Sequence, residues 1–367
     1  MNSKQRILSA LDHREPDRVP LDFWAEKIIV KRLMQHLKLT YYEQLLRHFQ
    51  IDTRYVQGTR YRGPALAGGQ DGTWKDIWGV VRKPVYFDEN DPEKGMIQHV
   101  VNHPLAAAER VKDVENYPWP SSDWYEYTID QETRGLEQYA VVCGADRLNR
   151  TAQFKPAMYL RGIEKLLLDL VMNPKIVEAM VERLTAYYLE YNEKIFHRAN
   201  GKIDIFFMGD DFGTQEGMFL SKPMWRDFFK PGFKKFIEQA HSHGIKVMHH
   251  TCGSVVDLIP EFIDCGLDIL QSLQPRAKNM DFKKIKKEYG KYISFQGGID
   301  IQNTMPFGTV AQVKAEVKRT IETLGRGGGY ILCTSHNFQP DTPIENIFAM
   351  YEAALEAGKY PFPRANA

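Results

Sequence analysis

The sequence predicts an α/β protein, a single (β/α)8 TIM-type barrel, and three observations point to this fold class. Eight short apolar segments alternate with longer segments whose apolar residues follow a helical period. Strands that alternate with helices form parallel sheets, and eight such units suit a closed barrel. The glycine-rich phosphate loops of open doubly wound sheets, GxGxxG or GxxxxGK(S/T), do not occur in the sequence. We therefore expect one barrel domain over residues 1–367, with an N-terminal helical extension.

Each predicted strand is a short apolar run bounded by polar or turn residues. The eight runs cover residues 18–25, 52–58, 139–147, 203–212, 246–253, 267–274, 291–300 and 329–338. Helical segments fill the gaps, and a long helical region covers residues 162–199. Three further helical segments end on glycine, which accepts the left-handed conformation at a helix C-terminus; they cover residues 224–244, 255–266 and 309–329.

Residues 59–105 are predicted to form an insertion in the barrel. The stretch "GGQDGTWKDIWGVVRKPVYF" contains an Asp-Gly turn and alternating residues, which together indicate a β-hairpin. Trp74 and Trp78 lie four residues apart in it. We expect both indole rings to pack the hairpin onto the barrel rather than to bind a substrate.

The composition excludes several classes of protein. The 48 basic and 47 acidic residues balance to a net charge of +1, so no basic excess favours nucleic acid or an anionic membrane surface. No window reaches the roughly 18–20 apolar residues of a membrane span, and the charged N-terminal stretch is not a secretory signal. Four cysteines in 367 residues are too few for a disulfide framework. These features predict a cytoplasmic protein with reduced cysteines.

Polar and ionisable residues gather at the ends of the predicted strands. Active sites of such barrels form at the C-terminal ends of the strands, and unpaired buried charge is too costly to serve packing alone. We therefore predict an active site from the residues at these ends: Asp22, Trp24, Arg147, Asp210, Asp211, His250, Cys252, Gln271, Gln274, Gln296, Asp300 and His336.

The stretch "KVMHHTCGSV" at residues 246–255 suggests a metal site. Side chains two apart on a strand share a face, so His250 and Cys252 point the same way. Zinc favours imidazole nitrogen and thiolate sulfur as ligands. A buried cysteine beside a hydrogen-bonded histidine is the alternative, and His336 at another strand end supplies a third candidate ligand.

Three stretches of the chain carry a resemblance to a known family: "RILSALDHREPDRVPL", "HTCGSV" and "GGGYILCTSHNFQPDTPIENIFAMYEAA". They resemble the uroporphyrinogen decarboxylase superfamily, and the resemblance runs through most of the chain. It implies a single (β/α)8 barrel and one of two activities. One branch removes acetate carboxyls from a porphyrinogen without a cofactor. The other contains zinc-dependent methyltransferases that work with a corrinoid protein.

The sequence resembles the methyltransferase branch more closely. The decarboxylases carry a Met-Arg-Gln-Ala-Gly-Arg run that binds a polyanionic substrate, and "RVPLDFWAEKIIVKR" stands in its place here. The methyltransferases carry an HxCG zinc motif after a strand, which His250, Cys252 and Gly253 match. Their third ligand is a cysteine near the start of an "xxPxTP" segment, where this chain has His336.

Cys333 is the other candidate for the third ligand. It precedes His336 by three residues, so on a regular strand the two side chains face opposite ways and only one can join His250 and Cys252. Because barrels place their chemistry at strand ends, we predict zinc ligands His250, Cys252 and His336, with Cys333 as an outward-facing packing residue. An irregular strand end would instead keep the family's two-cysteine ligand set.

The predicted function is zinc-dependent transfer of a methyl group between a small molecule and a corrinoid protein. The chain has no DxHxxG corrinoid motif, so the corrinoid (cobalamin) is expected on a partner protein; a homodimer stays open. Asp210 and Asp211 are the predicted catalytic residues, as substrate-orienting or acid/base groups; supporting a metal-bound histidine or capping a loop is equally compatible. Predicted substrate-binding residues are Trp24, Arg147, Gln274 and Gln296, although a structural salt bridge suits Arg147 as well.

Two other classes of function compete with this one. A cofactor-free decarboxylase or lyase acting on a small acid would use Asp22 or Asp210 to stabilise developing positive charge and His250 as an acid/base group. The third class is a non-catalytic binding protein built on a barrel that has lost its active site. The density of polar residues at the strand ends argues against it.

Overall fold

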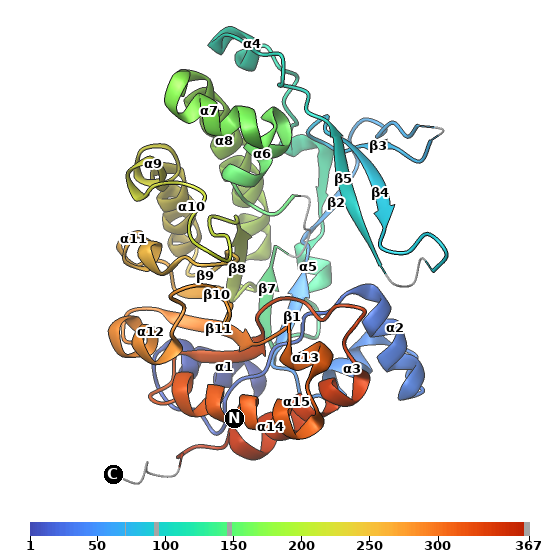
Figure 1. Ribbon diagram of the computed structural model, residues 1–367, viewed down its shortest axis with the longest axis vertical. Helices are drawn as coiled ribbons and strands as arrows, with labels where there is room; N and C mark the ends of the chain where they lie inside the picture. The colour runs from blue at the N-terminus through green and yellow to red at the C-terminus, as the bar shows by residue number, and fades with distance from the viewer. Residues whose placement is uncertain (70, 92–94, 145–148, 363–367) are drawn as a thin grey trace.

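A computed structural model describes residues 1–69, 71–91, 95–144 and 149–362, and it has an α/β fold built on a seven-stranded parallel sheet (Figure 1). The strand order is β1-β7-β8-β9-β10-β11-β12, and every adjacent pair is parallel. These strands confirm seven of the eight predicted ones: β1 (Thr53–Val56), β7 (Ala140–Cys143), β8 (Ile205–Gly209), β9 (Lys246–His250), β10 (Ile269–Leu273), β11 (Ser294–Ile299) and β12 (Tyr330–Thr334).

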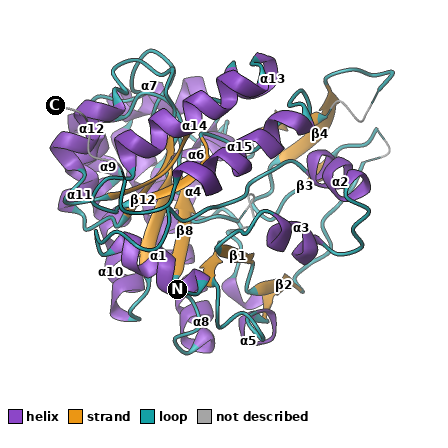
Figure 2. Cartoon of the chain, turned by 90° about the horizontal axis from the view of Figure 1, so that it is seen from below, coloured by secondary structure: helices purple, strands orange, loops and turns teal. Residues whose placement is uncertain are grey.

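Helices pack around this sheet, as the view from below shows (Figure 2). The helices of the described residues are α1 (Ser3–Leu11), α2 (Lys27–His36), α3 (Tyr42–His48), α4 (Val111–Glu115), α5 (Ile129–Glu132), α6 (Phe154–Arg161), α7 (Ile163–Met172), α8 (Pro174–Ala199), α9 (Lys222–Phe228), α10 (Lys230–Ser242), α11 (Ile259–Asp264), α12 (Phe282–Tyr289), α13 (Thr304–Phe307), α14 (Val310–Leu324) and α15 (Ile344–Ala357). Among the described residues no helix is both long and apolar enough to cross a membrane.

The strands are buried on both faces, which is why they read as continuous apolar runs rather than alternating ones. One face packs against the helices in the large core cluster. The other face forms a second cluster inside the curved sheet, closed at one end by α1 residues Ile7 and Leu11; its strand members are Ala140, Val142, Ile205, Phe207, Met248, Ile269 and Ile331.

The first predicted strand, residues 18–25, is not a regular strand, and that prediction is wrong in this respect. The segment makes only isolated parallel bridges, such as the one between Leu21 and Leu332. It still lies between β12 and β1, because Leu332 N–H donates to the carbonyl of Pro20 at 2.9 Å and Asp52 N–H donates to that of Leu21 at 2.9 Å. A regular ladder fails for two reasons: Pro20 has no N–H, and the N–H of Leu21 donates to the Asp52 carboxylate at 2.8 Å.

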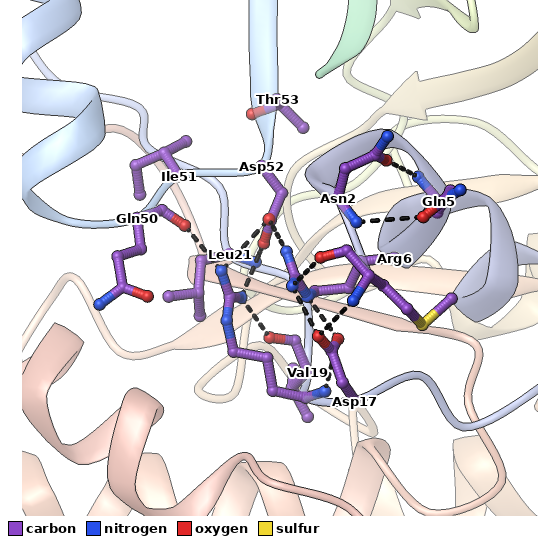
Figure 3. Close-up of polar contacts among 12 residues, drawn as sticks. Asn2, Gln5, Arg6, Asp17, Val19, Leu21, Gln50, Ile51, Asp52 and Thr53 are labelled. Carbon is purple, nitrogen blue, oxygen red and sulfur yellow. Dashed lines mark hydrogen bonds and ion pairs between the residues drawn. The ribbon is translucent and has the colours of Figure 1, made fainter. Parts of the chain in front are cut away.

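The Asp52 carboxylate holds this segment at the start of β1, as Figure 3 shows. Arg6 donates to it at 2.6 Å and Arg18 at 2.7 Å, and Asp17 also accepts from Arg6. The side chain of Asp52 is 0% exposed. Two guanidinium groups and a backbone N–H thus neutralise one buried carboxylate at the N-terminal end of the sheet.

The insertion at residues 59–105 forms antiparallel structure that is larger than the predicted hairpin. Strands β3 (Trp74–Lys75), β4 (Val81–Tyr86) and β5 (Met96–Asn102) make a three-stranded sheet, and β2 (Thr59–Tyr61) pairs with β6 (Tyr125–Tyr127). Trp78 is buried, and its ring centroid lies 4.9 Å from that of Tyr187 on α8. It therefore packs the insertion onto the helical layer. The Trp74 indole instead donates to Gln98 within the small sheet at 2.9 Å.

Candidate metal centre

The structure brings the three predicted metal ligands together. His250 is the last residue of β9, Cys252 follows two positions later, and His336 lies two residues beyond β12. One ligand atom from each side chain lies within 4.8 Å of the other two. The ligands therefore come from the ends of β9 and β12, two parallel strands separated in the sheet by β10 and β11, at the C-terminal edge where barrels place their chemistry.

The imidazole of His250 is oriented by Gln271. The two residues are register partners on β9 and β10, and the His250 Nδ1 atom is hydrogen-bonded to the Gln271 side-chain oxygen. This bond leaves Nε2 facing the Cys252 sulfur, at 3.4 Å. Zinc–nitrogen and zinc–sulfur bonds of the usual lengths, at a tetrahedral angle, separate N and S by about 3.5 Å. The His250–Cys252 pair thus has the spacing of two ligands of one zinc ion.

The Cys252 loop depends on two glycines that bring two backbones together. Gly253 has φ +83°, and a Cβ there would lie 2.6 Å from the carbonyl carbon of Gly213. A Cβ at Gly213 would lie 2.6 Å from the Cys252 carbonyl oxygen. The Gly253 N–H donates to the Gln274 side-chain oxygen at 2.8 Å. The loops after β8 and β9 are therefore in direct backbone contact, which places the Cys252 sulfur.

His336 reaches the cluster because the chain turns after β12. The hydroxyl of Thr334 donates to the carbonyl of His336, which ends the extended conformation. The indole of Trp24 lies against both histidines, with ring centroids 5.0 Å from His336 and 5.4 Å from His250. Trp24 thus forms an apolar wall of the cluster, in keeping with its predicted place beside the reacting groups.

The prediction that Cys333 faces outward is wrong. Tyr330 and Leu332 pack in the cluster that contains the helices, whereas Ile331 belongs to the inner cluster. By alternation Cys333 shares the inner face of Ile331, where burial and the Asp22 carboxylate raise its pKa well above the usual value. The prediction assumed that side chains alternate from Cys333 to His336, but β12 ends at Thr334, so the alternation does not extend to His336. Even so, the described cluster consists of His250, Cys252 and His336.

Asp211 touches the cluster directly. Its Oδ1 atom lies 3.4 Å from His250 Nε2 and accepts the Cys252 N–H at 3.1 Å, while Oδ2 pairs with the ammonium group of Lys155. Burial opposes its ionisation, but His250 and Lys155 together hold the pKa of Asp211 below its usual range. Asp211 is therefore a carboxylate next to the ligand atoms, and Lys155 is its counter-ion.

Asp210 points away from the cluster toward the start of α6. Its carboxylate accepts the backbone N–H groups of Gln153, Phe154 and Lys155 at 2.6–2.7 Å. Burial raises the pKa of Asp210 to about 6, although these three donors favour the ionised form. Both oxygens are thus occupied, and the group holds α6 against the end of β8.

Burial also sets the protonation of the ligand side chains. It holds the pKa of His250 well below the usual value and raises that of the Cys252 thiol to about 12. Neutral imidazole is the form that binds metals, whereas the thiol must lose its proton. The donor set fits zinc, and metal binding at Cys252 would be coupled to proton release.

The remaining predicted residues have structural partners. Gln274 holds the Cys252 loop, and its side-chain oxygen also accepts from Gln215 at 2.9 Å. Gln296 donates to Asp22 at 2.6 Å inside the sheet, where the Tyr55 hydroxyl donates to the same carboxylate. Asp300 accepts backbone N–H groups ahead of α13. Arg147 lies outside the described residues.

The sequence did not predict two residues that contact the site, and it predicted a third without its role. Lys155 and Gln215 were not predicted, because both lie in stretches with no motif and reach the site only through the fold. Gln271 was recognised as a strand-end residue without a role. Its position beside His250 on the next parallel strand is the signal that could have identified it as the orienting partner.

Comparison with known proteins identifies the family. The sequence profile described as Uroporphyrinogen decarboxylase (URO-D) matches residues 149–357. The chain belongs to the uroporphyrinogen decarboxylase family. The matched region contains all three candidate ligands together with Gln271, Asp210 and Asp211.

One solved structure shares the fold of the chain. A methyltransferase from Methanosarcina mazei is 20% identical and superposes with a TM-score of 0.66 over 97% of this chain and 99% of that chain. A D-psicose 3-epimerase from Clostridium cellulolyticum H10 is 9% identical, with a TM-score of 0.37 over 66% of this chain and 86% of that chain, a likeness too weak to carry an argument. No curated protein matches the sequence.

Proposed function

We propose that this chain is a zinc-dependent methyltransferase that moves a methyl group between a small molecule and a corrinoid carried by a partner protein. The observation that carries the proposal is the convergence of His250, Cys252 and His336, whose ligand atoms lie within 4.8 Å of one another. A cofactor-free decarboxylase has no need for a half-buried thiol beside two imidazoles. Three protein ligands leave one position of a tetrahedral ion for a substrate.

Zinc held there would act as a Lewis acid on the heteroatom of a methyl donor or on the thiol of an acceptor. One thiolate and two neutral imidazoles bring less negative charge than a two-cysteine ligand set, which favours the donor-activating role. Asp211, beside His250, is positioned to accept a hydrogen bond from a substrate held at the cluster. Asp210 acts by positioning, through its bonds to the start of α6.

Two further features support the methyltransferase branch over the decarboxylase branch. The N-terminal segment lacks an arginine-rich run, and Trp24 and Phe23 stand in it. Arginine forks are what a polycarboxylate substrate requires. The fold-level likeness to a protein named methyltransferase is in keeping with this choice. The chain has no corrinoid motif, so a separate protein supplies the corrinoid.

We also infer that residues 19–25 complete an eight-membered barrel. The segment bonds to β12 on one side and to the start of β1 on the other. Such closure places Trp24 among the strand ends that surround the ligand cluster.

The test combines metal analysis with a methyl-transfer assay. Purified protein should hold about one zinc per chain, and Cys252→Ala and His336→Ala should each lose most of it. Cys333→Ala is the matched control, because it removes a buried thiol of the same sheet that lies outside the cluster. Demethylation of methylcobalamin should be accelerated with a panel of thiols, phenols and amines, and the two ligand variants should lose this acceleration.

Three results would each contradict a part of the proposal. Full zinc occupancy in Cys252→Ala would show that the cluster is not the metal site. Loss of zinc in Cys333→Ala with retention in His336→Ala would assign the third ligand to the cysteine. Zinc binding without any acceleration of demethylation would favour the decarboxylase or lyase activity.

A further inference from the structure

A cavity lies near the candidate metal centre. It has a volume of about 570 Å³ and opens where β1 ends, between the small antiparallel sheets and α5. None of the three candidate metal ligands is among the described residues that line it. Tyr55 forms the boundary: it lines the cavity, and its ring lies 6.0 Å from that of Phe207, which in turn lies 6.4 Å from the His250 ring.

Asn149 lines this cavity and carries a buried donor without a described partner. The residue is 5% exposed, and its Oδ1 atom accepts the Tyr187 hydroxyl at 3.2 Å, which fixes the amide. Its Nδ2 group has no hydrogen-bond partner within the described parts of the chain. A buried donor without a partner costs free energy, so this amide calls for an acceptor atom from a bound molecule.

The acidic side chains of the lining are engaged within the protein, which leaves one cation of the described lining without an ion pair. Both oxygens of Glu132 already accept hydrogen bonds, from the N–H groups of Gln57 and Gly58 and from the Thr128 hydroxyl. Asp76, the other acid, is paired with Arg82 at 2.8 Å. Arg60 is exposed at the rim and makes no ion pair with any described residue. Its guanidinium group is the charge available to a ligand.

The walls of the cavity are aromatic. Tyr61 and Trp74 line it, and their polar atoms are occupied, by the carbonyl of Pro64 at 2.7 Å and by Gln98 at 2.9 Å. Only the apolar ring surfaces of these two side chains are left to contact a ligand, and such surfaces pack against planar apolar groups. The volume lies within the range of small-molecule sites.

We propose that this cavity binds a small aromatic carboxylate. The ring lies between the aromatic walls, the carboxylate pairs with Arg60, and Asn149 Nδ2 donates to an oxygen of the ligand. This binding site goes beyond methyl transfer and does not depend on the metal centre.

Calorimetry with 2-naphthoate tests the proposal, with 2-naphthylmethanol and 2-naphthylmethylamine as probes of the same ring and different charge. Naphthoate should bind tightest. Arg60→Gln should weaken it by about tenfold or more, the loss expected for a charge-assisted pair, without affecting the alcohol. Arg62→Gln is the matched control, since Arg62 is exposed on the same segment but pairs with Glu126 at 2.8 Å. Cys252→Ala should bind naphthoate as the wild type does.

Asn149→Leu should also weaken naphthoate, and a melting curve checks that this buried variant folds. Several results would overturn the proposal: no naphthoate binding at millimolar concentration, an amine that binds as tightly as the acid, or equal effects of the Arg60 and Arg62 variants. Naphthoate binding lost in Cys252→Ala and kept in Arg60→Gln would place the ligand at the metal centre instead. Zinc content is measured separately, so failure of this site and failure of the proposed methyltransferase activity give different results.

Discussion

Gln271 orients His250 without being a ligand, and replacing it by methionine tests that role. The methionine side chain has a similar length but cannot accept the hydrogen bond that Gln271 makes with Nδ1 of His250. Removing such an orienting partner typically weakens a metal site by about 10–100-fold, or about 1.4–2.7 kcal/mol. We therefore expect Gln271→Met to bind zinc about 10–100-fold more weakly than the wild type.

The same change should leave the metal-free fold almost as stable as before. Gln271 is 0% exposed, and its Nε2 group has no partner among the residues the structure describes. Methionine removes this buried unpartnered donor, worth about 1–3 kcal/mol, while it leaves His250 Nδ1 unpaired at a cost of similar size. The two effects oppose each other, so the free energy of unfolding should change by about 1 kcal/mol or less.

Competition with a chromophoric chelator measures the zinc affinity, and denaturant unfolding of the metal-free protein measures stability. Gln296→Met is the matched control: Gln296 is the register partner of Gln271 on β11, is equally buried, and donates to Asp22 instead of contacting a histidine. It should keep the wild-type zinc affinity. Affinity within twofold of the wild type in Gln271→Met, or equal losses in both variants, would refute the orienting role.

Three further perturbations probe the loop, the N-terminal network and a charge cluster. Gly253→Ala should lower zinc content and destabilise the fold by at least about 1 kcal/mol, because its φ is +83° and a Cβ would collide with the neighbouring backbone; a wild-type metal content would contradict this. Asp52→Ala should cost about 3–5 kcal/mol in denaturant unfolding, since it leaves two arginines without their buried partner, whereas Asp17→Ala, with a side chain 42% exposed, should cost about 1 kcal/mol or less. The hydrogen bond from Arg226, with help from Lys230, lowers the pKa of Glu261 to about 2, so its stabilisation is complete above about pH 5 and is lost as the pH falls toward 2. Glu261→Gln should therefore be less stable than the wild type by about 1 kcal/mol at pH 7, with the difference vanishing near pH 2; a difference independent of pH would contradict the pairing.

The local sequence pattern was sufficient to predict most strands of the parallel sheet. The seven strands that were predicted correctly are buried on both faces, so each appears in the sequence as an uninterrupted apolar run between turn residues. Residues 18–25 form a similar apolar run in the sequence, but they do not form a regular ladder of backbone hydrogen bonds with their neighbours. Their hydrogen bonds go partly to the carboxylate of Asp52, a partner that no local pattern of the segment reveals.

The ligands His250 and Cys252 followed from strand alternation, since two residues of one short segment need no knowledge of the rest of the fold. The position of His336 depended on where β12 stops, and alternation therefore gave the wrong face for Cys333. Conversely, only the assembled fold shows that Gln271 accompanies His250 and that Lys155 neutralises Asp211.

The sequence by itself determined the α/β class, the order of the strands, and which residue types stand at their ends, because each of these depends on neighbours within a few positions. Only the tertiary structure decided which of those strand-end residues meet and which serve the framework. Asp210 and Asp211 are adjacent in sequence, yet one carboxylate bonds to the start of α6 and the other contacts His250. Successive side chains at a strand end point in different directions, and what lies in each direction is supplied by segments distant in the chain.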